Sequence, residues 1–298
     1  MTSQTARAMP GAIWMVLGAI ASVQLGAAVA KNLFGVVPPV TMAWLRLAAA
    51  AVALLVLGAL ARARRPSAGS GAVAGTGAGN AAAPARSWRD GLAYAVCLVG
   101  MNVSIYEAFA RLPLGLAVTL EFLGPLGLSV LGSRRARDVL WALLALAGVA
   151  LLGFTPTGMD PVGVFFALLA GALWAGYIAT AARAGRTWAS RDALTLACGL
   201  GAVALAVPAI AQGGAQIWRP DVLLAGAGVG LLSSVIPYSL EMVALKSIPP
   251  RVFGILMSLE PAAAALAALI LLGEKLSPTD LLAMGCVIVA SIGATRSA

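Results

Sequence analysis

The sequence predicts an all-α membrane protein with ten transmembrane helices, and three observations lead to this fold class. Of the 298 residues, 61% are hydrophobic and only 10% are charged, whereas soluble domains carry about 25% charged residues. Apolar runs long enough to cross a hydrocarbon core of roughly 30 Å recur along the whole chain. The basic residues gather in alternate segments between these runs, as the positive-inside rule describes.

Ten apolar runs are expected to form the spans. They are 11–31, 37–60, 88–110, 113–131 and 137–153 in the first half, and 160–182, 190–211, 219–245, 249–271 and 277–294 in the second. The first run is too long for a signal-peptide core and lacks a clear cleavage site, so we interpret it as a helix. Residues 66–85 are low-complexity Gly, Ala, Ser and Pro sequence, which predicts a flexible cytoplasmic linker.

The distribution of charge predicts that both termini are cytoplasmic. With the N-terminus inside, the inside segments hold fifteen of the twenty basic residues: Arg7, Arg62, Arg64, Arg65, Arg86, Arg89, Arg134, Arg135, Arg137, Arg183, Arg186, Arg191, Lys246, Arg251 and Arg296. The outside segments hold only Lys31, Arg111, Arg219 and Lys275. This asymmetry predicts a ten-span topology with the N- and C-termini on the cytoplasmic side.

The odd number of spans in each half predicts an inverted internal repeat. Two halves with five spans each and a common fold must be inverted relative to one another. The fourth span carries Glu121 and Pro125, and the ninth carries Glu260 and Pro261; each follows a turn that contains proline. We therefore expect two five-helix repeats, one over 11–153 that includes the linker, and one over 160–294.

Five ionisable residues fall within the predicted spans. At a rise of 1.5 Å per helical residue, Arg46, Glu121 and Glu260 lie near the membrane midplane. Glu107 lies nearer the outside and Glu241 nearer the inside. Ionisable groups are costly in hydrocarbon and usually mark a functional site or an internal cavity. Prolines inside spans point the same way, because the backbone groups they release must be satisfied by protein or water.

These charges predict a site for a zwitterion near the midplane. Arg46 can pair with a carboxylate in bidentate fashion, and Glu121 or Glu260 can accept an ammonium group. Carboxyl groups removed from water can exchange protons near neutral pH, so Glu121, Glu260, Glu241 and Glu107 are the candidates for proton coupling. The alternative is that Arg46 pairs with a glutamate and only holds the bundle together, and the sequence leaves both interpretations open.

Uncharged side chains within the spans extend the candidate substrate site. Gln24, Asn102 and Tyr238 can contact hydroxyl or amide groups of a substrate, although hydrogen bonds between helices are the simpler interpretation. Trp44 and Trp174 lie away from the membrane interfaces and can form walls of a cavity, with ordinary packing as the alternative.

Several functional classes receive no support from the sequence. There are no histidines, and the three cysteines are isolated in apolar runs, so no metal site, disulfide framework or cofactor is expected. No nucleophile–base pair or nucleotide-binding loop favours a membrane enzyme, and no repeated filter loop favours a channel. The net charge of +9 reflects the loops facing the cytoplasm and does not predict nucleic-acid binding. The sequence leaves open whether the chain forms a homodimer.

Long motifs in this chain resemble a known transporter family. They are PLGLAVTLEFLGPL (113–126), SRR (133–135), PYSLEMVAL (237–245), RVFGILMSLEPAAAAL (251–266), LGE (272–274) and LLAMG (281–285), together with Gln24, Ala30-Lys31, Leu33-Phe34 and Arg46-Leu47. Across nearly the whole chain these motifs are similar to the EamA-type permeases of the drug/metabolite transporter superfamily, and in particular to the threonine and homoserine exporters. The linker at 66–85 departs from this pattern.

The resemblance implies two inverted EamA repeats, a location in the bacterial inner membrane and efflux of small metabolites. It also implies that the substrate is an amino acid such as threonine or homoserine. We expect a secondary transporter with alternating access and proton antiport, whose partners are the substrate, protons and the lipid bilayer. An exporter of another metabolite or drug is the alternative, since one fold serves many substrates; a membrane-embedded enzyme is less favoured.

Overall fold

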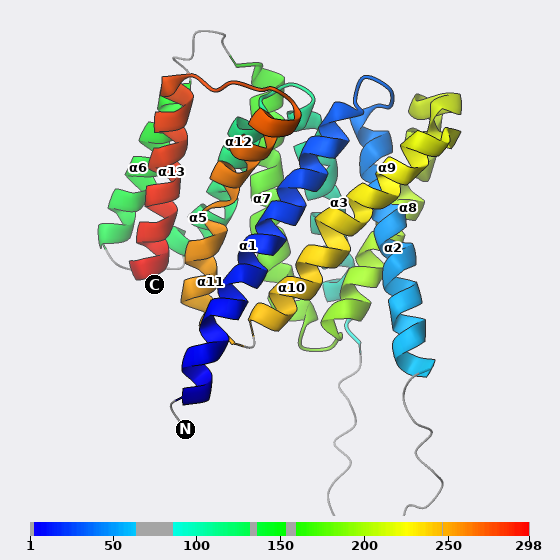
Figure 1. The fold of residues 1–298 in the computed structure, drawn as a ribbon, viewed down its shortest axis with the longest axis horizontal. Coiled ribbons are helices and arrows are strands. Elements are labelled where there is room, and N and C mark those ends of the chain that lie inside the picture. The colour runs from blue at the N-terminus through cyan, green and yellow to red at the C-terminus, as the bar shows by residue number, and fades with distance from the viewer. Residues whose placement is uncertain (1–2, 64–85, 132–135, 153–158, 246, 298) are drawn as a thin grey trace, which may run out of the picture.

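The computed structural model describes residues 3–63, 86–131, 136–152, 159–245 and 247–297, and these form a bundle of helices (Figure 1). The α-helices are α1 (Ser3–Asn32), α2 (Pro39–Ala63), α3 (Trp88–Phe109), α4 (Leu114–Glu121), α5 (Leu123–Leu131), α6 (Ala136–Leu152), α7 (Pro161–Ala184), α8 (Ser190–Gly213), α9 (Pro220–Gly230), α10 (Ile236–Ala244), α11 (Pro250–Met257), α12 (Glu260–Leu271) and α13 (Pro278–Ser297). A 3₁₀ turn, η1 (Gly214–Trp218), precedes α9, and a π-helical turn, η2 (Leu231–Val235), joins α9 to α10. The predicted linker, 66–85, lies outside the described residues.

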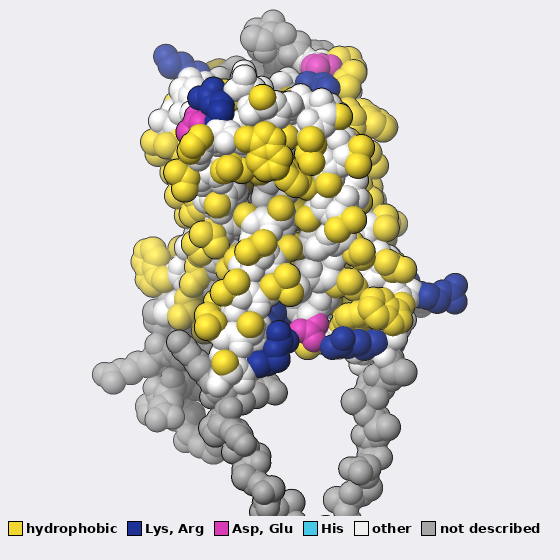
Figure 2. Space-filling model, turned by 90° about the vertical axis from the view of Figure 1, so that its right-hand side faces the viewer, with side chains coloured by type: hydrophobic (Ala, Val, Ile, Leu, Met, Phe, Trp, Pro, Cys, Tyr) yellow, Lys and Arg dark blue, Asp and Glu magenta, His cyan; other side chains and the backbone are white. Residues whose placement is uncertain are grey.

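The expected all-helical membrane fold is confirmed. Within the described residues, nine helical segments are long and apolar enough to cross a membrane: Gly11–Asn32, Pro39–Ala63, Trp88–Phe109, Leu114–Leu131, Pro161–Ala184, Ser190–Trp218, Pro220–Ala244, Val252–Leu271 and Pro278–Arg296. The span predicted at 137–153 corresponds to α6, whose apolar part, Val139–Leu151, is shorter. Figure 2 shows hydrophobic side chains over the height of one face and charged side chains near its two ends, as expected for a surface in contact with lipid.

The helices pack in pairs that join distant parts of the chain. The α3 helix packs on α7, α2 on α8 and α6 on α13. The α1 helix packs on η2 and α10, and α4 packs on α12. The start of α1 and the end of α13 lie at one end of the bundle, which we call the terminal end (Figure 1). The loops after α1 and α12 lie at the opposite end.

Two spans are interrupted next to their glutamates. The α4 and α5 helices are separated at Phe122, directly after Glu121, and α11 and α12 are separated at 258–259, directly before Glu260. Proline has no backbone N–H to donate to the residue four positions earlier. Pro125 and Pro261 therefore leave the carbonyl groups of Glu121 and Met257 without the usual helical partner.

The first of these breaks is packed closely against α7. A Cβ atom on Gly124 would overlap the backbone of Gly171, and a Cβ atom on Gly171 would lie against the carbonyl oxygen of Glu121. The two backbones can approach this closely only because both positions are glycine. The contact fixes the position at which the chain changes direction, and with it the position of Glu121.

Candidate functional site

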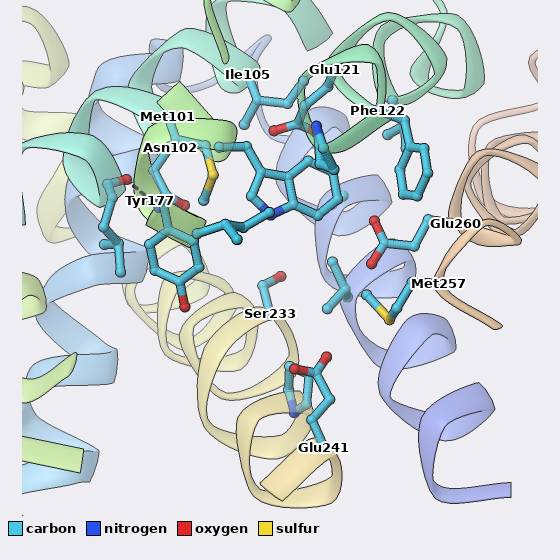
Figure 3. A pocket seen from close by; sticks show the side chains of 18 of the residues that line it. Met101, Asn102, Ile105, Glu121, Phe122, Tyr177, Ser233, Glu241, Met257 and Glu260 are labelled. Carbon is cyan, nitrogen blue, oxygen red and sulfur yellow. Dashed lines mark hydrogen bonds between the residues drawn. The ribbon is translucent and has the colours of Figure 1, made fainter. Parts of the chain in front are cut away.

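A cavity of about 490 Å³ lies inside the bundle, and both halves of the chain contribute to its walls. Its lining comes from α1, α2, α3, α4, α5, α7, α8, η2, α10, α11, α12 and α13. Arg46, Glu121, Glu241 and Glu260 all belong to this lining. Figure 3 shows Glu121 and Glu260 around one part of the cavity, with Glu241 farther along. The tertiary structure thus collects into one space the charges that the sequence places in four different spans.

Arg46 is held by uncharged groups of η2. Its Nη2 donates to the carbonyl oxygen of Ser233 at 2.9 Å, and its Nε donates to Ser234 Oγ at 3.3 Å. The guanidinium carbon lies 5.8 Å from the centre of the Tyr106 ring. Within the described part of the chain, no carboxylate forms an ion pair with Arg46. The purely structural alternative, an ion pair between Arg46 and a glutamate, is therefore absent from these residues.

The π-helical turn explains how η2 can hold an arginine. An α-helix uses its carbonyl groups for its own hydrogen bonds, whereas a π-helical turn shifts the pairing by one residue and is frequent at functional sites. Gly26 of α1 faces Ser233, and Gly230 faces the backbone at Arg46. These glycines let α1 and α2 approach η2 closely, which places Arg46 against the two serines.

Glu121 and Glu260 are buried at the two helix breaks. Glu121 is the last residue of α4 and is 9% exposed; Glu260 is the first residue of α12 and is 7% exposed. Neither carboxylate has a hydrogen-bond partner or an ion pair among the described residues. Glu121 interacts electrostatically with Arg46, and Glu260 interacts with Glu121 and Glu241. Three carboxylates and one cation thus line one cavity.

Four of the uncharged candidates line the cavity. Gln24 of α1, Asn102 of α3, Trp174 of α7 and Tyr238 of α10 are all part of its wall. The Trp174 ring packs edge-on against Phe122, with their ring centres 5.4 Å apart. This contact places an aromatic wall beside the break that follows Glu121.

Two predicted site residues lie outside the cavity lining. The indole Nε1 of Trp44 donates to the carbonyl oxygen of Ala202 on α8 at 2.7 Å. Glu107 pairs with Arg111 at 2.6 Å, near the end of α3. Trp44 is only two residues from Arg46, and residues two apart on a helix point in different directions. The depth of these residues in the membrane could be estimated from the sequence. The direction in which each side chain points from its helix could not.

Several polar atoms in this wall lack partners. Gln24 Oε1, Asn102 Oδ1, Ser233 Oγ and Tyr238 OH are buried without a hydrogen bond in the described part of the chain. Buried polar atoms are normally paired, so each unpaired one requires an explanation. Sequence reasoning did not single out Ser233 and Ser234. The adjacent serines in the apolar run 219–245, shortly before Pro237, were the available signal.

At the end opposite the terminal end, a small group of polar contacts joins three segments of the chain. Lys31 Nζ forms an ion pair with Glu274 Oε1 and donates to the carbonyl oxygen of Leu112 at 2.6 Å. Glu274 Oε2 accepts from the backbone N–H of Leu114 at 2.8 Å. We call Lys31, Leu112, Leu114 and Glu274 the closing cluster. Just below it, α4 and α12 meet at Gly115 and Ala265.

Toward the terminal end, the cavity lining continues to the ends of the helices. Ser129 lies near the end of α5, Leu194 near the start of α8 and Thr295 near the end of α13, and all three belong to the lining. The cavity lining therefore runs from Glu121 and Glu260 toward the terminal end, and no residue of the closing cluster belongs to it.

Comparisons with known proteins agree with this architecture. The sequence model of the EamA-like transporter family matches residues 161–296. The threonine/homoserine exporter RhtA of Escherichia coli (strain K12) is 40% identical over 299 residues, which cover 97% of this chain and 93% of that protein. RhtA of Salmonella typhimurium (strain LT2) is 38% identical over 302 residues, covering 96% and 95%. One crystal structure superposes with a TM-score of 0.63 at 20% identity, over 97% of this chain and 98% of that chain, and shows the fold alone.

Proposed function

The chain belongs to the EamA-like transporter family, and from this premise we propose that it exports amino acids such as threonine and homoserine across the bacterial inner membrane. Family membership makes the chain a multi-pass membrane transporter and not an enzyme. The observation that carries the substrate proposal is a cavity in which Arg46, without an acidic partner among the described residues, shares the space with Glu121 and Glu260. The threonine/homoserine exporters that the chain resembles supply the substrate class.

The charges of the cavity suit a free amino acid. Two N–H groups of Arg46 are used by Ser233 and Ser234, and a guanidinium has five. The remaining donors can bind the substrate carboxylate as a charge-assisted pair. Glu121 or Glu260 accepts the substrate ammonium group. A neutral solute would leave these charges uncompensated in a low-dielectric site, which is costly.

We also propose that the chain consists of two inverted five-helix repeats, 11–153 and 160–294. Several of the helix pairs support this proposal, because each is matched when the halves are exchanged. The contact of α3 with α7 corresponds to that of α10 with α1, and the contacts of α2 with α8, α6 with α13 and α4 with α12 correspond to themselves. The two broken spans, with Glu121 and Glu260 at their breaks, are equivalent in this arrangement.

Transport by such a site requires alternating access. We place the terminal end in the cytoplasm, as the basic residues of the loops indicate, so that the cavity extends inward and the closing cluster lies outside. The substrate enters from the cytoplasm and binds between Arg46 and a glutamate. After the cavity opens outward, a proton from outside neutralises the glutamate and releases the ammonium group. Loss of that proton to the cytoplasm resets the site.

Counterflow in proteoliposomes tests the proposed function. Proteoliposomes that contain the purified protein are loaded with unlabelled substrate. The accumulation of labelled threonine, homoserine and a panel of other amino acids and metabolites inside them is then measured. Saturable counterflow of threonine and homoserine, accelerated by a pH gradient, is expected. Counterflow of other metabolites without any amino acid would overturn the substrate proposal. Flux that does not saturate would indicate a channel.

A further inference from the structure

We propose that Asn102 selects substrates that carry a side-chain hydroxyl group, by presenting one fixed hydrogen-bond acceptor to the cavity. This inference rests on the proposed function, since it assumes an amino acid held at Arg46. It assigns the discrimination among amino acids to one side chain of α3, and separates that role from the charged residues that every amino acid would use.

The orientation of the Asn102 amide is set by its own helix. Its Nδ2 donates to the carbonyl oxygen of Leu98, one turn earlier, at 2.8 Å. This bond leaves Oδ1 as the free end of the amide. Asn102 is 3% exposed, and Oδ1 has no hydrogen-bond partner among the described residues. Figure 3 shows the side chain on the cavity wall, next to Met101 and Tyr177. An amide carbonyl can only accept, so the free end selects for a donor.

Asn102 and Arg46 line the same cavity, and Tyr106 of α3 relates their positions. Asn102 and Tyr106 are four residues apart on α3, so their side chains lie on one face, about 6 Å apart along the axis. The Arg46 guanidinium lies 5.8 Å from the centre of the Tyr106 ring. Asn102 therefore lies one turn of α3 from the residue whose ring the cation faces, and Asn102 and Arg46 both line the cavity. An amino acid whose carboxylate is held at Arg46 can extend its side chain across the cavity to Oδ1.

The chemistry of a buried acceptor explains why the preference should be strong. A hydroxyl group gives Oδ1 its missing donor, whereas an apolar side chain of the same shape leaves Oδ1 buried and unpaired. Sites built to hydrogen-bond a substrate hydroxyl reject the analogue without it by factors of about 10⁴ or more. Threonine and valine have nearly the same shape and differ in this one group, so they form the natural test pair.

Ser233 provides a contrast within the same cavity. Its carbonyl oxygen accepts from Arg46, and its Oγ, which faces Gly26 of α1 at the cavity wall, lacks a partner in the described part of the chain. A hydroxyl at this place can donate to the carboxylate held by Arg46. Every amino acid has that carboxylate. Ser233 should therefore contribute equally to the binding of threonine and of valine, whereas Asn102 should contribute to the binding of threonine alone.

The experiment measures how well threonine and valine each compete with labelled threonine for counterflow in proteoliposomes. It uses the wild type, Asn102→Leu, which keeps the shape but removes the acceptor, and Ser233→Ala. Asn102→Ala is included in case leucine prevents folding, and size-exclusion chromatography checks each variant. Thr180→Val is the matched control, because the Thr180 hydroxyl is paired within its own helix to Gly176 at 2.7 Å and does not line the cavity.

The expected result is a change in selectivity that only the Asn102 variants show. In the wild type, threonine should compete at least about 100-fold better than valine. In Asn102→Leu or Asn102→Ala this ratio should fall below about tenfold, through loss of threonine affinity. Ser233→Ala should lower the apparent affinities for threonine and valine by the same factor, so that their ratio stays as in the wild type. Thr180→Val should change neither the affinities nor the ratio.

Three outcomes would overturn the inference. If the wild type transports threonine but does not prefer it to valine, no hydroxyl is recognised. If the Asn102 variants keep the wild-type ratio of threonine to valine affinity, or lose affinity for both equally, Asn102 is not the selecting residue. If the wild type transports no amino acid at all, the proposed function fails first and the inference fails with it.

Discussion

Arg46 is the residue on which the proposed site depends most directly. Its partners are a carbonyl oxygen and a hydroxyl oxygen of η2, and these neutral groups orient the guanidinium without neutralising it. An arginine buried against a carboxylate would be satisfied by that ion pair. Here the charge remains available, within the described residues, to a negatively charged group of the substrate.

Replacing Arg46 with lysine should weaken amino-acid binding although the positive charge is kept. A lysine ammonium is a point charge and cannot reproduce the planar fork that binds a carboxylate while also contacting Ser233 and Ser234. We expect the half-saturating concentration of threonine in counterflow to rise about 10- to 100-fold, equivalent to roughly 1.4–2.8 kcal/mol. Arg62→Lys, in the last turn of the same helix, is the control. Equal half-saturation in the wild type and Arg46→Lys would contradict the role of the guanidinium.

Glu121→Gln and Glu260→Gln should separate proton coupling from substrate exchange. Both glutamates are buried in the cavity, and glutamine keeps their size while removing the titratable group. Both variants should fold and insert but lose efflux driven by a pH gradient. The variant that replaces the proton-carrying glutamate should retain some exchange without a gradient. Efflux and exchange are measured in the same vesicles at several pH values.

The control for this experiment is Glu107→Gln, because Glu107 pairs with Arg111 outside the cavity. It should transport like the wild type. If both Glu121→Gln and Glu260→Gln also transported at the wild-type rate, with unchanged pH dependence, neither glutamate would carry the proton. Glu241, which lines the same cavity, would then be the residue to test.

At the scale of elements, interrupted helices position the charged groups. The break between α4 and α5 sets the direction of Glu121, and the break before α12 sets that of Glu260. The prolines remove one helical hydrogen bond at each break. The first break is fixed by the contact of Gly124 with Gly171, and η2 provides the oxygens that hold Arg46. Helices without these irregularities would place the same residues at the same depth but on other faces.

Gly124→Ala should destabilise the protein, whereas Gly127→Ala on the same helix should not. A Cβ atom at position 124 would overlap the backbone of Gly171, which no rotation of a side chain can relieve. Overpacking of this kind costs about 1–3 kcal/mol. Nothing lies within 4 Å of a Cβ atom at position 127, and alanine there favours a helix. Thermal unfolding midpoints of the purified variants measure the difference; equal midpoints would contradict the close contact.

At the scale of the whole molecule, one small group of contacts joins distant segments at the end opposite the terminal end. The closing cluster joins the end of α1, the loop before α4 and the loop after α12. These segments are distant in sequence, and in the proposed transport cycle they must separate for the cavity to open outward. The cluster therefore stabilises the state with the outer end closed relative to the state with that end open.

Replacing Lys31 or Glu274 with alanine should increase access to the cavity from the outside. A cysteine introduced at the cavity residue Met101, in a variant without Cys97, Cys198 and Cys286, reports this access. Its labelling by a membrane-impermeant thiol reagent in right-side-out vesicles should become several-fold faster in either variant. Asp221→Ala is the control, because the pair of Asp221 with Arg219 joins residues only two apart. Unchanged labelling in Lys31→Ala and Glu274→Ala would rule out the closing role.

The proposed orientation predicts opposite sides for two segments. A cysteine at Gly75, in the linker, should be labelled only after the membrane is permeabilised, because the proposed orientation places the linker in the cytoplasm. A cysteine at Asp160, which precedes α7, should be labelled in intact cells. The variant without native cysteines serves as the blank. Labelling of both positions from outside would show that the proposed topology is wrong.

The sequence by itself determined the helical spans and predicted the depth of their charged residues. The free energy of transferring an apolar segment from water to lipid depends on the composition of that segment alone. Composition therefore locates each membrane-spanning helix. A constant rise per residue then gives the depth of Arg46, Glu121 and Glu260. The absence of a backbone N–H in proline is also a property of one position in the chain. It predicted where two spans would be interrupted.

Only the tertiary structure decided which of these residues meet. The sequence did not distinguish Trp174, on the cavity wall, from Trp44, which bonds to α8, or Glu241 from the outlying Glu107. It did not indicate that Ser233 and Ser234 hold Arg46, or that Lys31 reaches Glu274. These relations depend on the rotation and close approach of helices from distant parts of the chain. Packing of small residues sets that geometry, because contacts among side chains, and not transfer into lipid, distinguish one helix face from another.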